Sequence, residues 1–144
     1  MKTENDFNKY VTKQVRLLGT SVAAVKFSDR FKAGVSDWMF FKAGMAAAVE
    51  AKFIKDLPGP KASLALKHPV SGPQITFLKK MTLCGVRSFV FLGIGSLKKI
   101  ILIRQMEIPD SGNFSPEWVR EKLEVGPVFS FHDVEGIVDY IFIE

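Results

Sequence analysis

The sequence predicts a single α/β domain in which helices flank a small mixed β-sheet. The chain has 144 residues, a usual length for one domain and enough to bury a substantial core. Apolar residues make up 47% of it, with 13 phenylalanines, a composition that argues against disorder. Segments with helical periodicity alternate with short runs of β-branched and aromatic residues, and this alternation predicts the α/β class.

The predicted elements begin with a helix that is capped by Thr3, has Asp6 three residues later and ends at Gly19. A second helix starts near Pro73, a favoured first-turn residue, and ends at Gly85. Strands are predicted at 21–28, 38–41, 46–53, 87–92 and 99–104. A proline-rich irregular segment occupies 54–73, a short helix 115–123, and an apolar tail that we take as helical 132–143.

Charge and cysteine content limit the possible partners, metal sites and cellular compartments. The formal net charge is +5, which is compatible with a polyanionic partner but does not identify one. Cys84 is the only cysteine, so an internal disulfide and a cysteine-based zinc site are excluded; it lies in an apolar helix and is expected in the core. The first residues lack an apolar signal core, and no apolar run reaches the ~18 residues of a membrane span. We therefore expect a cytoplasmic protein with no membrane partner.

Three charged residues interrupt the most apolar part of the chain: Asp37, Glu50 and Lys52. Glu50 and Lys52 are two residues apart, so they project from the same face of a strand. A loop of two or four residues centred on Ala43-Gly44 pairs residues whose numbers sum to 87, and then Asp37 lies directly opposite Glu50. A three-residue loop would place the two carboxylates on opposite faces.

Two interpretations of this pattern remain open. Directly opposed carboxylates repel each other, and a hard divalent cation between them reverses the sign of that energy, which predicts a metal site beside Lys52. The alternative is a solvated face with an incidental Glu–Lys pair. The apolar sequence around Glu50 favours the metal site, because an incidental charge is less expected there. Glu4 extends the buried stripe of the first helix as a third metal-directed carboxylate, or it is an acid that the helix dipole favours.

With these residues the chain resembles the PD-(D/E)XK nuclease superfamily, and within it the small VRR-NUC-type and phage Holliday-junction resolvase-like nucleases. The matching pieces are Glu4, GVSDW at 34–38, VEAK at 49–52 and QITFLKKMTLCG at 74–85, followed by the strand VRSFVFLG. The resemblance covers about residues 4–104. It implies a restriction-endonuclease-like core within a single domain of residues 1–144, with 105–144 as a helical, apolar C-terminal extension. Ser36 stands where the family often has proline, a common substitution that leaves the chemistry intact.

The resemblance also implies a reaction. The protein would be a Mg²⁺- or Mn²⁺-dependent endodeoxyribonuclease that hydrolyses phosphodiester bonds without a small-molecule organic cofactor, in the cytoplasm of a bacterium or of a phage-infected host. Asp37 and Glu50 would hold the metal, with the Ala51 carbonyl and Glu4 as further ligands. Lys52 would orient the attacking water or neutralise the transition state. Gln74 would position the nucleophile or Lys52; its alternative is a local hydrogen bond at the helix start.

Basic side chains are the expected DNA contacts, although each alone also fits an ordinary solvated charge. The candidates are Arg30, Lys32, Lys55, Lys61 and Lys67, with His68, Lys79 and Lys80 as further ones. A four-way junction is resolved by two symmetric nicks, and one site cuts one strand, so a homodimer is expected. The tail at 137–143 either covers the domain's own sheet or contacts the second copy.

The leading expectation is a structure-selective nuclease for branched DNA. One alternative is a catalytically inactive nucleic-acid-binding or virion protein on the same fold. Another is a nuclease for nicked, single-stranded or RNA substrates, because one fold supports many functions.

Overall fold

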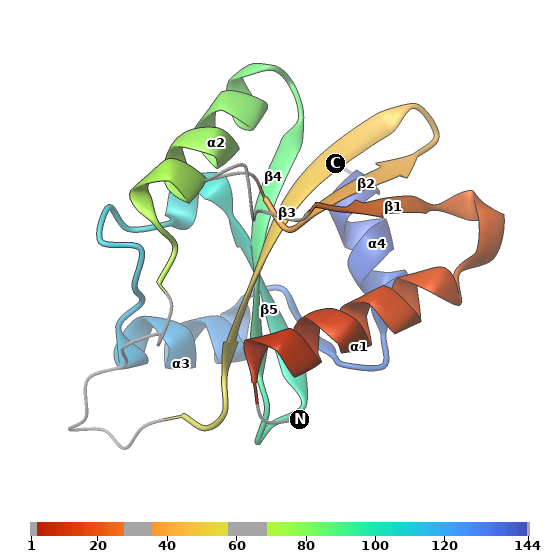
Figure 1. Cartoon of the computed structure of the whole chain (residues 1–144). Helices are drawn as coiled ribbons and strands as arrows, with labels where there is room; N and C mark the ends of the chain where they lie inside the picture. Colours follow the sequence, from red (N-terminus) through yellow and green to blue (C-terminus); the bar gives the residue numbers. More distant parts are fainter. Residues whose placement is uncertain (1–2, 28–35, 58–68, 144) are drawn as a thin grey trace.

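One six-stranded β-sheet, covered by helices on both faces, forms the centre of the molecule (Figure 1). The computed structural model describes residues 3–27, 36–57 and 69–143. The strands lie in sequence order across the sheet. They are β1 (Ala23–Lys26), β2 (Trp38–Lys42), β3 (Met45–Ile54), β4 (Arg87–Ile94), β5 (Lys99–Arg104) and β6 (Val128–Ser130).

The sheet is mixed. β3 and β4 pair in parallel, and the other neighbouring strands pair antiparallel. The parallel pair requires a crossover, which the helix α2 (Gly72–Leu83) provides between β3 and β4. This arrangement confirms the predicted α/β class with a small mixed sheet flanked by helices.

Two hydrophobic cores occupy the two faces of the sheet. On one face pack α1 (Glu4–Arg16) and α4 (Val134–Ile143), which Figure 1 shows together beside β1 and β2. On the other face pack α2 and α3 (Pro116–Val125). Consecutive residues of β3 alternate between these cores, so that Val49 and Ala51 face α1, whereas Ala48 and Ile54 face α2. Both faces of β3 are therefore buried.

Local sequence explains the ends of the helices near the sheet. The Thr3 hydroxyl accepts a hydrogen bond from Asp6 N at 3.1 Å and caps α1 as predicted. At the start of α2, Ser71 and Gln74 form a capping box: Ser71 Oγ accepts from Gln74 N, and Gln74 Oε1 accepts from Ser71 N. The capping box holds Gln74 at the first turn of α2, facing the sheet.

The β2–β3 hairpin closes through a two-residue turn. Ala43 and Gly44 both have positive φ values, 50° and 78°, as a type I′ turn requires. The register then pairs Trp38 with Val49 and Lys42 with Met45, so partner numbers sum to 87. This confirms the prediction of a loop with an even number of residues. The same register places Asp37 on the side of the sheet where Glu50 lies.

The C-terminal segment contributes to both cores. The short strand β6 pairs with β5 and was not expected from the sequence, because three residues carry too little periodicity. Between β5 and α3 lies a single turn of 3-10 helix, η3 (Gln105–Glu107); another, η1 (Gly19–Ser21), follows α1. The tail forms α4 and covers the domain's own sheet, with Ile137 and Ile141 buried, as one of the two interpretations predicted.

One side chain lies elsewhere than expected. Cys84 was predicted in the core, but it is the C-cap residue of α2 and is exposed, because the helix ends there. No helix in the described parts of the chain is both long and apolar enough to cross a membrane.

Candidate active site

The candidate site lies where β2 and β3 separate. Their hydrogen-bonded ladder ends at the pair Trp38–Val49, whereas β3 continues to Ile54 and pairs there with β4 alone. Within the described residues, the edge of β3 that faces β2 therefore has no strand partner from Glu50 onward. Side chains from α1 and α2, which pack on opposite faces, both reach this opening.

Asp37 occupies the open edge, immediately before β2. Its Oδ2 accepts a hydrogen bond from Ala51 N at 2.8 Å. Because the N–H and C=O of one strand residue point toward the same neighbour, the Ala51 carbonyl is directed to this side as well. The Asp37 carboxylate and the Ala51 main chain thus lie together, as the predicted ligand set requires.

Support for Asp37 comes from the residues around it. The Trp38 ring donates from Nε1 to Asn8 Oδ1 of α1 at 3.2 Å, and Ser36 Oγ donates to Trp38 O at 3.1 Å. Asn8 and Ser36 are both buried. Asn8 was not among the predicted site residues, although its position one helical turn after Glu4, on the buried stripe, was a usable signal.

Glu50 is almost fully buried, with an exposed fraction of 1%. Burial, reinforced by the negative charge of Asp37, raises the pKa of Glu50 to about 9, although Lys52 acts in the opposite direction. Among the described residues no donor reaches Glu50 Oε2. Two ionised carboxylates share no proton, so a hydrogen bond between Glu50 and Asp37 forms only when one of them is protonated. The metal-free protein therefore favours a neutral Glu50.

Gln74 holds the other oxygen of Glu50. Its Nε2 donates to Glu50 Oε1 at 2.8 Å while its Oε1 remains in the capping box of α2. The side-chain amide therefore makes both the local bond that we gave as an alternative and a contact with the site. Gln74 therefore holds Oε1 of Glu50 in place, and it does not bond to Oε2.

Lys52 lies between two carboxylates. Its Nζ is 3.5 Å from Glu50 Oε1 and 4.0 Å from Glu4 Oε1, and the side chain is buried. Glu50 and Lys52 thus belong to the interior and not to a solvated face. Glu4 reaches the site from the first turn of α1, and there it faces the ammonium group.

The donor set suits a hard divalent cation. Among the described residues Glu50 Oε2 is a buried oxygen without a donor, and the nearby Asp37 carboxylate offers a second hard oxygen. In the described parts of the chain no three His, Cys, Asp or Glu side chains gather closely enough to form a complete cage. Mg²⁺ needs no such cage, because it keeps several waters and is often held by one or two carboxylates together with substrate phosphates.

The predicted DNA contacts are only partly described. Lys55 is exposed just beyond the end of β3, and Lys79 and Lys80 are exposed on α2. The remaining candidates, Arg30, Lys32, Lys61, Lys67 and His68, lie outside the described residues.

Comparison with known proteins supports the fold. No model of a known protein family matches the chain, and no curated protein sequence does. The structure is similar to that of Hjc, a Holliday junction resolvase from the archaeal hyperthermophile Archaeoglobus fulgidus, with a TM-score of 0.55 and 16% sequence identity. The superposition covers 89% of this chain and 96% of that one. This protein therefore has the nuclease-like α/β fold of an archaeal Holliday junction resolvase.

Proposed function

We propose that the protein is a metal-dependent DNA endonuclease that hydrolyses phosphodiester bonds in branched DNA. The observation that carries the proposal is the convergence of Asp37, Glu50, Lys52 and Gln74 at the open edge of β3. Glu50 and Lys52 are ionisable side chains buried in an apolar interior, with Asp37 half-buried beside them, and burying such groups is unfavourable and typical of functional sites. The nuclease-like fold gives this arrangement a chemical context.

Asp37 and Glu50 would hold the cation, with the Ala51 carbonyl on the same side, and oxygen ligands of this kind suit Mg²⁺ or Mn²⁺. When bound, the ion lowers the pKa of a coordinated water and stabilises charge on the scissile phosphate. Its positive charge also opposes the two causes that raise the pKa of Glu50, so the site would then contain an ionised Glu50. Glu4 is a further candidate ligand, since its side chain reaches Lys52 from α1.

The other side chains would act on orientation and charge. Lys52 is buried beside Glu50, so its ammonium group would orient the attacking water or stabilise the additional negative charge of the transition state. Gln74 is a positioning residue, because its bond to Glu50 Oε1 sets the direction of Oε2. The direct contact of Gln74 is with Glu50 and not with Lys52.

For the substrate we propose a four-way junction or another branched DNA, with a homodimer as the acting species. The fold is shared with a Holliday junction resolvase, and a net charge of +5 suits a polyanion. The described residues of one chain form one candidate site. Two nicks related by a two-fold axis therefore require two copies.

A cleavage assay tests the proposal. Labelled four-way, three-way, nicked, linear, single-stranded and RNA substrates are incubated with purified protein and Mg²⁺ or Mn²⁺, with chelator in parallel. We expect metal-dependent cleavage of the branched substrates at the lowest protein concentration. The control is Glu124→Gln, which removes an exposed carboxylate of α3 and should cleave normally.

Other results of the cleavage assay would favour one of the alternative functions. Preferred cleavage of nicked, single-stranded or RNA substrates keeps the enzyme but rejects the branched substrate. DNA binding without cleavage under any metal identifies an inactive binding protein on this fold.

A further inference from the structure

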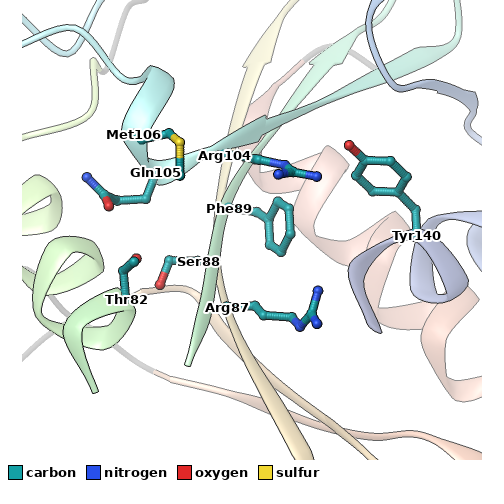
Figure 2. A pocket seen from close by; sticks show the side chains of 8 residues that line it. All are labelled: Thr82, Arg87, Ser88, Phe89, Arg104, Gln105, Met106 and Tyr140. Atoms are coloured by element: carbon teal, nitrogen blue, oxygen red, sulfur yellow. The ribbon is translucent and has the colours of Figure 1, made fainter. Parts of the chain in front are cut away.

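A second cleft lies away from the candidate active site, where β4 and β5 run between the end of α2 and α4 (Figure 2). Its lining includes Thr82 of the last turn of α2, whereas Gln74 lies in the first turn. Eight residues of helix separate them by roughly 12 Å. On the sheet, Arg87 of the cleft lies opposite Ala47, three residues before Glu50, which is roughly 10 Å along the strand.

Strand register brings two arginines together in this cleft. Arg104 is the direct partner of Phe89, and Arg87 precedes Phe89 by two residues on the same face. The two arginines are therefore diagonal neighbours, whose Cβ atoms are about 7 Å apart or less. Figure 2 shows both side chains directed to the side of Tyr140, with the Phe89 ring between them. Two like charges so placed repel each other unless an anion lies between them.

The cleft supplies donors and no negative charge. None of its lining residues is Asp or Glu. Within residues 3–27, 36–57 and 69–143, neither guanidinium group forms an ion pair and the Tyr140 hydroxyl forms no hydrogen bond. The carboxylates on adjoining segments are engaged elsewhere: Glu107 pairs with Lys122, and Asp139 with Lys42. A ligand that binds both guanidinium groups here must therefore bring the negative charge.

Size restricts the ligand. The cavity has a volume of about 140 Å³, below the roughly 300–1,000 Å³ of sites that enclose a small organic molecule. This volume has room for a tetrahedral oxyanion but does not enclose a whole nucleotide. Guanidinium groups bind phosphate oxygens through paired, charge-assisted hydrogen bonds.

We propose that this cleft is a second DNA contact, in which Arg87 and Arg104 bind one backbone phosphate of a strand outside the scissile bond. The inference rests on the proposed function, in that the ligand is a nucleic acid. Arg87 faces α4, whereas Glu50 faces α2, so the phosphate held here belongs to another part of the substrate than the one at the metal site. Such a contact would select substrates whose strands diverge, because both sites must be reached at once.

The test measures binding without cleavage. In a Glu50→Gln background without divalent metal, the affinity for a fluorescent four-way junction is measured by anisotropy from about 50 to about 200 mM salt. We expect Arg87→Gln/Arg104→Gln to weaken binding several-fold and to reduce the slope of log K against log salt by about 1, the value for one phosphate contact. The matched control is Arg16→Gln, which removes an exposed arginine at the end of α1 and should leave both quantities unchanged. If the double variant fails to fold, the affinity and the salt slope are measured with Arg104→Gln alone, because Arg104 is exposed and its replacement should not disturb the fold.

A second arm uses inorganic phosphate as the probe and follows the arginine Nε–Hε signals by NMR. Phosphate that perturbs these signals, combined with the smaller salt slope, supports the proposal. If phosphate binds but the junction affinity and slope are unchanged, the cleft takes a free anion and the DNA contact is rejected. If phosphate leaves the arginine signals unchanged and the double variant binds the junction as before, the cleft is not an anion site. If the wild type cleaves or binds branched DNA and the double variant behaves identically, only this inference is rejected. If the wild type binds no nucleic acid, the proposed function is rejected too.

Discussion

Gln74 links the first turn of α2 to the buried carboxylate of Glu50 through a 2.8 Å hydrogen bond from Nε2 to Oε1. The same amide closes the capping box with Ser71. One side chain therefore couples the position of a helix to the orientation of a proposed metal ligand. A change of Gln74 should therefore weaken the cap of α2 and release the Glu50 carboxylate at the same time.

Replacing Gln74 with alanine should lower the free energy of unfolding by about 1–2 kcal/mol, since it removes a cap bond and the donor to a buried oxygen. Urea denaturation measures the change. Ser71→Gly is the matched control, because it disturbs the cap by only a few tenths of a kcal/mol and leaves the bond to Glu50 in place. Equal losses in both variants would show that the Gln74–Glu50 bond contributes nothing.

Asp37→Asn and Glu50→Gln should each reduce cleavage by more than roughly 10³-fold, because each removes a negative ligand of the proposed cation. Neither should reduce stability, since glutamine is neutral as Glu50 is in the metal-free protein, and asparagine keeps an oxygen that can accept from Ala51 N. Gel-based cleavage and thermal denaturation measure the two effects, with Glu124→Gln as the control. Undiminished cleavage by the double variant would refute the assignment of the site.

Glu50 should make the stability of the metal-free protein depend on pH. Its pKa is about 9 in the folded state and about 4.5 in the unfolded chain, so between these values the folded state binds more protons. Stability from this group is complete below pH 4.5 and decreases as the pH rises toward 9, by at most about 1.4 kcal/mol per pH unit. Urea titrations across this range should show the decrease in the wild type and a flatter profile in Glu50→Gln.

The same experiment at pH 8 with added Mg²⁺ or Mn²⁺ should raise the stability of the wild type, because a ligand that binds only the folded state stabilises it. Glu50→Gln should gain much less. An equal gain in both proteins would place metal binding elsewhere.

Lys52→Met should retain metal binding and lose most turnover, because the ammonium group is proposed to act on the water or the transition state. Methionine keeps most of the side-chain volume in this buried position. Isothermal calorimetry gives the metal affinity and single-turnover cleavage gives the rate, with Lys13→Met on the exposed side of α1 as the control. Lost metal affinity would instead make Lys52 a structural partner of Glu50 and Glu4.

Sedimentation at micromolar concentration should give twice the 16.1 kDa mass of the chain. The reason is the requirement for two symmetric nicks on a four-way junction. A strict monomer, also with junction DNA bound, would contradict a resolvase and leave a nickase or an end-acting nuclease.

The sequence by itself determined the fold class and the approximate positions of the main helices and strands. The periodicity of α1 and the alternation in β2 and β3 are local, and so are the signals that end them, such as Thr3 at the N-cap. The Ala43-Gly44 turn sets the register of its own strands, because a two-residue type I′ turn leaves only one pairing. From the sequence, however, a three-residue loop stayed possible, and only the structure shows the two-residue turn that puts Asp37 on the side of Glu50.

Tertiary structure alone decided which distant side chains meet. The parallel pairing of β3 with β4, the addition of β6 and the packing of α4 depend on contacts between segments far apart in sequence, which no local pattern encodes. The bond from Gln74 to Glu50 exists because α2 crosses over the sheet with its first turn beside β3. The Arg87–Arg104 cleft likewise requires the register of β4 with β5 and the approach of Tyr140 from α4. A one-residue shift in that register would turn one arginine to the other face, because side chains alternate along each strand.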